Sequence, residues 1–440
     1  MNIRNSIIFA TGICLMFGAA SPVRSATSNS TATEDSAILD QRVISAMADW
    51  QVPGLAIVVV RDGKAVLMKG YGNRQLGSVQ EIDEKTYLQI ASNSKAFAAY
   101  SIGMLVDDGK LNWNDSVKRH IPKLSLPDPF VEENISIDDL LSHRSGLTEV
   151  GLGGFQNTEY TIIDLLRDLE TTPLSVRFRA KNNYSQVGMA LLGEIVERVS
   201  GMTWGEFVRA RIFEPLGMDS SYTSTTDFEN RVGIPSDLEN IMMPAIMANG
   251  QVANGSWEDV GATPLYAPAG GIISNLVDMS TWIRFRLNDG AIAGEKLIST
   301  NSLEEIRAPR IPMDMNAIGI PSTFVHPSAH LIDVGYGHYS FEHHGRKMII
   351  HNGGWMTSVI AIVPDANIGV GVFSNAWFDE PAPWSSLAFV NALVLDIFDH
   401  HFEHPHEDWT GRMKAIVAAR ANAIDDDTPD SEARDLSNHQ

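Results

Sequence analysis

The fold is organised by one stretch, Leu88 to Tyr100, which reads LQIASNSKAFAAY. It opens as an apolar, strand-like run and continues as a helix pattern of small residues. Ser92 stands at the junction, where the N-terminus of a helix leaves backbone N–H groups without intrahelical partners. Lys95 follows three residues later, so the two side chains are predicted to share one face of the helix.

A hydroxyl beside an amine is a candidate catalytic pair. Serine is a weak nucleophile until a neighbouring base takes its proton, and a neutral lysine can be that base. Burial or a nearby cation keeps a lysine neutral by lowering its pKa. The same pattern is also typical of a helix cap followed by a solvated lysine, although this is the only Ser-x-x-Lys in the sequence. The interpretation therefore depends on partners further along the chain.

Composition narrows the class of protein. The chain has 440 residues, of which 44% are hydrophobic and 20% charged, as in ordinary globular proteins. This length predicts one large domain with an insertion, or two packed domains. The formal net charge of −21 argues against nucleic acids and anionic membrane surfaces as partners.

The first 25 residues are predicted to be a signal peptide. A basic residue precedes an apolar run over 6–20, and small residues follow, with Ala20 or Ser25 as the last residue before cleavage. We therefore expect an exported protein, periplasmic or secreted, with an uncleaved anchor as the alternative. The only cysteine, Cys14, lies in this run, so the mature chain would depend on core packing and not on disulfides.

The remaining chain is predicted to fold in the α+β class, with an antiparallel sheet flanked by helices and an inserted, mostly helical subdomain. Strand signals fall early, at 55–60 and 65–71, and late, at 333–339, 347–351, 358–363 and 368–373. Between them the pattern changes to short helices and loops. The predicted parts are a polar linker (26–36), an α/β catalytic domain (37–111 and 267–399), a helical subdomain (112–266) and an acidic, partly disordered tail (400–440).

Helical periodicity predicts helices over 38–50, 92–107, 186–200, 275–287, 386–398 and 409–424. A cluster of histidines precedes the last of these: His400, His401, His404 and His406. They lie in a loop broken by proline, without the fixed spacing of a metal-binding helix. We expect solvated histidines here, and no metal site.

Two further motifs carry polar groups. Tyr184 precedes a predicted helix within Asn-Tyr-Ser-Gln, and a phenol there can relay protons. The second motif, His351-Asn352-Gly353-Gly354, ends an apolar strand, where glycines would let a substrate backbone approach closely. A backbone N–H beyond them could pair with that of Ser92 as donors to an oxyanion. A capping Tyr-Ser pair and a glycine bulge beside a satisfied histidine remain the alternatives for each motif alone.

Taken together, the motifs resemble the serine β-lactamase and penicillin-binding-protein superfamily, and within it the class C β-lactamase, esterase and D-aminopeptidase branch. The order is strand-Ser-x-x-Lys-helix, then Tyr-Ser-Gln before a helix, then His-Asn-Gly on a late strand. Residues 140–147, LLSHRSGL, are similar to the family's Leu-Leu-Thr-His-Thr-Ser-Gly-Leu. Residues 269–271, Ala-Gly-Gly, look like another of its elements. The resemblance covers about residues 38–398.

This resemblance implies roles for the residues that match. Ser92 would be the acylated nucleophile, Lys95 its base, and Tyr184 the group that shares proton transfer and protonates the leaving group. His351 and Gly353 would line the substrate, where the family has Lys-Thr-Gly or His-x-Gly. The backbone N–H groups of Ser92 and Gly354 would form the oxyanion hole. No metal or organic cofactor is implied.

Two departures from the family pattern bear on the substrate. Gln186 replaces the asparagine of Tyr-x-Asn, which holds the lysine and the substrate amide, and its longer side chain alters the reach. His351 replaces a lysine that would supply charge for a β-lactam carboxylate, and histidine is mostly neutral at pH 7. We expect a serine hydrolase for a small-molecule ester, amide or peptide; peptidase or carboxypeptidase action on D-residue peptides, β-lactamase action, and an acylated sensor without turnover are the alternatives.

Overall fold

The computed structural model describes residues 28–233, 240–248, 250–313, 332–354, 356–378 and 385–427. The predicted signal peptide (1–25) and the end of the predicted acidic tail (428–440) lie outside these residues. No helix within the described ranges combines the length and the apolar character needed to cross a membrane. The chain divides into two compact units, one ending at Arg42 and one beginning at Val43, and the second contains every element described below except the start of α1.

An eight-stranded antiparallel sheet forms the centre of the second unit, in the order β2-β1-β14-β13-β12-β11-β10-β9. Its strands are β1 (Gly54–Arg61), β2 (Lys64–Gly72), β9 (Ile311–Pro312), β10 (Ile332–Gly335), β11 (His338–His343), β12 (Arg346–Gly353), β13 (Ser358–Val363) and β14 (Ile368–Ser374). The early hairpin joins the late strands because β1 pairs with β14 from Leu55↔Ser374 to Arg61↔Ile368.

One predicted strand is in fact a hairpin. The stretch 333–339 divides into β10 and β11 around Tyr336 and Gly337. Gly337 has a φ of +68°, and a Cβ there would lie 2.6 Å from the backbone oxygen of Lys95. A glycine is needed at this turn both for its backbone conformation and for its close approach to the helix that carries Lys95.

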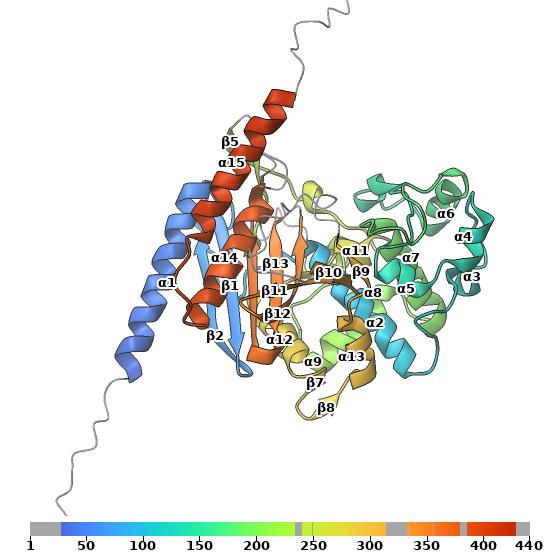
Figure 1. Cartoon of the computed structure of the whole chain (residues 1–440), viewed down its shortest axis with the longest axis horizontal. Coiled ribbons are helices and arrows are strands. Elements are labelled where there is room, and N and C mark those ends of the chain that lie inside the picture. The colour runs from blue at the N-terminus through green and yellow to red at the C-terminus, as the bar shows by residue number, and fades with distance from the viewer. Residues whose placement is uncertain are drawn as a thin grey trace, which may run out of the picture. The chain divides into compact units, whose positions relative to one another are not determined.

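Helices cover the sheet. The alternating residues Ala56, Val58 and Val60 of β1 belong to a core cluster with side chains of α2 (Ser94–Asp107) and α12 (Leu276–Leu287). Helix α14 (Ser385–His401) packs on β13 and β14, and α15 (Trp409–Asp427) packs on α14. Figure 1 shows α14 and α15 side by side along the sheet. These observations confirm the predicted α+β class with an antiparallel sheet flanked by helices.

A group of short helices lies beside α2, away from α14 and α15 (Figure 1). Helix α7 (Gln186–Ser200) is central to it, because α7 contacts α2, α5, α8 and α11. The helices of this group are α3 (Val117–His120), α4 (Pro129–Asn134), α5 (Ile137–Leu141), α6 (Ile162–Thr171), α7, α8 (Trp204–Val208), α9 (Glu214–Leu216), α10 (Thr225–Arg231) and α11 (Ala267–Gly270).

Short elements make up the rest of this unit within the described residues. The strand pairs are β3 (Leu88–Gln89) with β6 (Ile273–Ser274), β7 (Ala291–Ile292) with β8 (Glu295–Lys296), and β4 (Ala245–Ala248) with both β5 (Gln251–Asn254) and β15 (Ala376–Trp377). The remaining helical segments are α13 (Thr300–Arg307), the 3₁₀ turns η1 (Ala91–Asn93), η2 (Leu152–Phe155), η5 (Glu258–Val260) and η7 (Pro364–Ala366), and the π-turn η3 (Arg209–Phe213). The β4–β15 pairing links the end of the predicted helical subdomain to the chain that follows β14.

Helix α1 (Ser28–Trp50) begins earlier than the sequence pattern predicted. The stretch 28–36, expected to be part of a polar linker, is therefore helical. Its polar residues show no apolar period, so the sequence gives no signal for a helix there. Neither proline nor glycine occurs between Ser28 and Trp50, so no strong helix breaker interrupts the helix there.

Candidate active site

Ser92 lies in the turn η1, directly before α2, and is only partly buried. The preceding residue, Ala91, has a φ of +47°, a left-handed conformation that is uncommon for alanine. This turn is held from both sides. The N–H of Ile90 donates to the backbone oxygen of Ile272 at 3.0 Å, and the hydroxyl of Ser358 donates to the backbone oxygen of Ile90 at 2.7 Å. The nucleophile candidate thus sits on a fixed, strained turn.

Lys95 is fully buried, and its ammonium nitrogen faces three oxygens. The Nζ atom lies 3.1 Å from Ser92 Oγ, 2.7 Å from Gln186 Oε1 and 2.6 Å from the backbone oxygen of Ala269. Burial lowers the pKa of Lys95 from 10.5 to about 7, against the charge of Glu149, which raises it. Near neutral pH a substantial fraction of Lys95 is therefore neutral, and its lone pair can accept a proton from Ser92.

Tyr184 also lies next to Lys95. The Lys95 nitrogen is 4.7 Å from the centre of the phenol ring, and the Tyr184 hydroxyl hydrogen-bonds with Ser92 and Tyr339. Burial raises the pKa of Tyr184 above its ordinary range, and the Glu149 charge adds to this, although the hydrogen bond with Ser92 opposes it. Tyr184 is therefore a neutral phenol at physiological pH and is suited to donating a proton.

Gln186 is the first residue of α7 and connects two charged groups. Its side-chain oxygen accepts from Lys95, and its backbone N–H donates to both carboxylate oxygens of Glu149 at 3.0 Å. The longer amide thus reaches the lysine, as the asparagine of the related motif would. Burial raises the pKa of Glu149, while hydrogen bonds from Ser185 and Gln186 and the Lys95 charge act to lower it.

His351 forms the opposite side of the site on β12. It is 2% exposed, stacks on Tyr339 with ring centroids 4.8 Å apart, and its Nδ1 lies 2.6 Å from the backbone oxygen of Asn352. Burial and the Lys95 charge lower the pKa of His351 from 6.5 to about 3. It is neutral at physiological pH, as the sequence predicted for a histidine replacing a lysine.

Asn352, Gly353 and Gly354 follow at the end of β12. A Cβ on Gly353 would lie 2.7 Å from the Ala91 Cβ and 2.8 Å from the backbone oxygen of Ile90. The turn that precedes Ser92 therefore lies closely against Gly353. Asn352 is buried, and Gly354 lies in the turn after the strand.

Sequence reasoning did not identify three residues of this cluster: Glu149, Tyr339 and His143. His143 accepts the Ser185 N–H at 3.1 Å, and its ring lies 4.7 Å from that of Tyr184. It belongs to the motif at 140–147, whose sequence gives no chemical role to this histidine. Glu149 lies two residues beyond that motif, and Tyr339 on a strand with no local signal for a site. Only tertiary contacts bring the last two residues to Lys95 and Tyr184.

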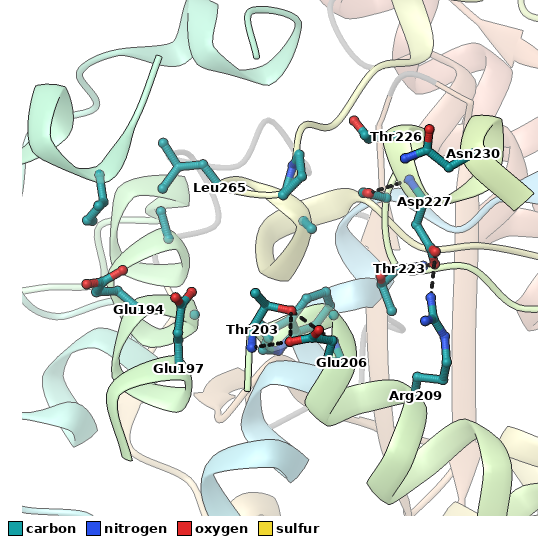
Figure 2. A pocket seen from close by; sticks show the side chains of 18 residues that line it. Glu194, Glu197, Thr203, Glu206, Arg209, Thr223, Thr226, Asp227, Asn230 and Leu265 are labelled. Carbon is teal, nitrogen blue, oxygen red and sulfur yellow. Dashed lines mark hydrogen bonds and ion pairs between the residues drawn. The ribbon is translucent and has the colours of Figure 1, made fainter. Parts of the chain in front are cut away.

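A separate cavity of about 410 Å³ lies along α7, α8 and α10 (Figure 2). Its wall carries several carboxylates, most of which have partners. Asp227 pairs with Arg209, and Glu206 caps its own helix through Thr203 (Figure 2). Burial raises the pKa of Glu197, and the neighbouring Glu194 and Glu206 add to this. None of the residues gathered around Ser92 lines this cavity.

The family model described as Beta-lactamase matches residues 39–387. The chain belongs to the beta-lactamase family. This match includes both the Ser92 stretch and the end of β12, so it covers the whole geometry described above.

Relatives of this beta-lactamase-family protein include hydrolases. It is 29% identical over 425 residues to unguisins hydrolase ungD' of Aspergillus campestris, covering 88% of this chain and 72% of the relative. It is 24% identical over 337 residues to protein flp of Staphylococcus aureus, covering 74% of this chain and 60% of that protein. The chain thus spans less than two thirds of the staphylococcal relative's length.

A solved structure shares the fold of this beta-lactamase-family protein. The octameric penicillin-binding protein homologue from Pyrococcus abyssi superposes with a TM-score of 0.66 at 24% identity, covering 84% of this chain and 78% of the other. This likeness supports the predicted α+β fold with an antiparallel sheet flanked by helices.

Proposed function

We propose that this protein is a serine hydrolase that forms an acyl-enzyme on Ser92 and hydrolyses an ester or an amide bond. One observation carries the proposal: a fully buried lysine nitrogen lies 3.1 Å from the hydroxyl of a partly accessible serine. A solvated lysine after a helix cap, the alternative left by the sequence, would not be buried. The hydrolase names of relatives support the same reaction class.

In the first half of the reaction, neutral Lys95 takes the proton of Ser92 while Oγ attacks the substrate carbonyl carbon. The carbonyl π electrons move to oxygen, and the backbone N–H groups of Ser92 and Gly354 are proposed to stabilise that oxyanion. As the carbonyl reforms, the bond to the leaving oxygen or nitrogen breaks. Tyr184 donates a proton to the leaving group and recovers one from Lys95, so the leaving group departs as an alcohol or an amine.

In the second half, water attacks the ester carbon of the acyl-enzyme and loses its proton to the same base system. The bond from carbon to Ser92 Oγ breaks, and Oγ takes a proton back. The net products are a carboxylic acid and the free enzyme. Gln186 holds Lys95 in position through both halves by accepting its N–H at 2.7 Å.

Because β12 offers no positive charge to the substrate, the site favours substrates that do not need a cation for binding. His351 is neutral, so it offers no charge to a β-lactam carboxylate. Esters and peptides need no such charge, and hydrolysis of D-residue peptides remains the second candidate. A relative at 29% identity is named as a hydrolase of unguisins, which favours a hydrolase over an acylated sensor without turnover.

We also propose that the enzyme acts outside the cytoplasm, in the periplasm or the medium. The support is the apolar run over 6–20 followed by small residues, which is typical of a signal peptide. Expression of the full chain with fractionation and N-terminal sequencing tests this. A mature start near residue 21 or 26 is expected, and an intact Met1 in the cytoplasm would contradict it.

The reaction is tested by intact-mass measurement of the mature protein with p-nitrophenyl butyrate, in parallel with Ser92→Ala. The wild type should gain a transient acyl mass and release many equivalents of product. Ser92→Ala should gain none while keeping the circular dichroism spectrum of the wild type.

Parallel reactions with a D-alanyl peptide and with nitrocefin distinguish the substrate classes. A single equivalent of product followed by a stable adduct would indicate the sensor. An adduct that persists in Ser92→Ala would overturn the assignment of the nucleophile.

A further inference from the structure

A pair of adjacent histidines, His343 and His344, lies at the opposite end of β12 from the active site. His343 and His344 end β11 and begin the turn into β12, and His351 follows seven residues after His344. His343 pairs with Arg346 at the start of β12, so five residues of the strand separate this level from His351, roughly 16 Å at about 3.3 Å a residue. The group therefore belongs to a different part of the sheet from Ser92.

Helix α14 supplies the third member of this group. Asp399, two residues before its end, is 2% exposed and points its Oδ1 atom at both imidazoles. The Nε2 atoms of His343 and His344 lie 2.8 and 3.1 Å from that oxygen. One atom from each side chain, three in all, lie within 4.8 Å of one another.

We propose that His343, His344 and Asp399 bind a divalent transition-metal ion of the zinc type, which fastens the end of α14 to the β11–β12 turn. Two imidazoles and one carboxylate are a donor set that such ions favour, whereas Mg²⁺ and Ca²⁺ prefer oxygen ligands. The three side chains come from two elements far apart in sequence, so the ion would cross-link them.

The spacing of the donor atoms suits such an ion. With bonds of about 2.0–2.2 Å, a tetrahedral ion holds its ligand atoms roughly 3.4 Å apart. The observed separations of 2.8 and 3.1 Å from Asp399 Oδ1 need to widen by only about half an ångström to reach that value. His343 is 1% exposed and His344 22% exposed in their side chains, so the group is closed on one side and reaches solvent on the other. The open side offers a path for the ion and a place for a water ligand.

Neighbouring groups hold the three side chains in position. The second carboxylate oxygen of Asp399 accepts the indole N–H of Trp409 at 2.6 Å, from the start of α15. The ring of His404 stacks on that of His344 with centroids 4.0 Å apart. Partners that orient the ligands in this way are typical of metal sites. They also connect α15 to the proposed site.

The histidine run at 400–406 does not supply a ligand to this proposed site. The spacing of His400, His401, His404 and His406 gave no metal pattern, and a set of solvated histidines was expected. In the structure His404 packs against His344, and burial lowers the pKa of His401 to about 4. The ligands that we propose lie elsewhere: two of them are adjacent residues of a turn some 55 positions earlier, and only the fold brings them to Asp399.

The test is calorimetric titration of the metal-stripped mature protein with Zn²⁺, compared with His344→Asn and with His400→Asn as the matched control. Asparagine suits the left-handed backbone of His344, whose φ is +49°, so this variant should fold. Wild type and His400→Asn should bind one equivalent, and His344→Asn should lose at least about tenfold in affinity. Mg²⁺ should not compete.

Two further measurements sharpen the outcome. Bound Zn²⁺ should raise the unfolding temperature of the wild type in a concentration-dependent way, and of His344→Asn much less. Co²⁺ should give visible absorption bands that His343→Asn removes. Failure of the wild type to bind Zn²⁺ below millimolar concentration, or binding that survives both substitutions, would overturn the proposal. Hydrolysis by Ser92 does not enter any of these readouts.

Discussion

The active site has two walls that differ in their charge. The helical wall, made by Lys95, Tyr184, Gln186 and Glu149, carries an amine, a phenol and a carboxylate. The sheet wall, made by Tyr339, His351 and Gly353, is uncharged at physiological pH, since burial and the Lys95 charge keep His351 neutral. In the proposed mechanism the helical wall transfers protons, whereas the sheet wall supplies shape and the backbone N–H of Gly354.

Among changes to the two walls, removing the amine of Lys95 should lower catalytic activity the most. Lys95→Ala deletes the only base within hydrogen-bonding distance of Ser92 Oγ among the described side chains whose pKa lies near 7. We expect kcat/KM for p-nitrophenyl butyrate to fall by about 10²–10⁴, towards the upper end of that range. Activity close to that of the wild type would show that Lys95 is not the base. It would also contradict the assignment of proton transfer to the helical wall.

Removing the phenol should cost less. Tyr184→Phe keeps the ring over Lys95 but loses the hydroxyl that hydrogen-bonds with Ser92. A fall in kcat of about 10²–10³ is expected, because water can replace part of the proton donation. The loss should be smaller for an activated ester than for an amide, whose leaving group needs the proton more. Equal losses for both substrates would argue against a donor role.

The sheet wall is tested by steric change. Gly353→Ala places a methyl group 2.7 Å from Ala91 Cβ and 2.8 Å from the Ile90 oxygen. We expect the free energy of unfolding to fall by about 1–3 kcal/mol, with a matching loss of activity. Gly153→Ala is the control, because a Cβ there meets nothing within 4 Å. Equal stability of the two variants would show that β12 and the serine turn are not in close contact.

The smallest effect is expected from Glu149→Gln. The Glu149 charge raises the pKa of Lys95, which burial holds at about 7. Since protonated Lys95 cannot act as a base, kcat/KM should fall as pH drops through about 7 in the wild type. Neutralising Glu149 should lower the pKa of Lys95 and move this limb to lower pH. A limb that stays in place or moves to higher pH would contradict the electrostatic link.

The helices that carry the candidate catalytic residues could be predicted because they depend on local sequence patterns. The strand-to-helix change at Ser92 and the periodicity of 186–200 each act over a few residues. The sequence therefore predicted α7 with the bounds that the structure has, and brought Ser92, Lys95 and Tyr184 into one hypothesis.

The remainder depends on contacts between distant segments. Glu149 reaches Lys95 only because its loop packs against the start of α7, and Tyr339 reaches Tyr184 only because a turn divides 333–339 into two strands. The contact between Gly353 and Ala91 has no local signal either, because it joins a late strand to the turn before Ser92. Likewise, nothing in the turn at His344 indicates Asp399.

The burial of α2 has a consequence for how the enzyme loses function. Every residue from Ser94 to Leu105 is buried, and Lys95 lies near the start of this run. The amide protons of such a helix exchange with solvent only when the whole protein opens. Local unfolding of surface segments would leave the relative positions of Ser92 and Lys95 unchanged. The loss of activity on heating should therefore follow the global unfolding curve. The activity that remains would then measure the fraction of folded protein.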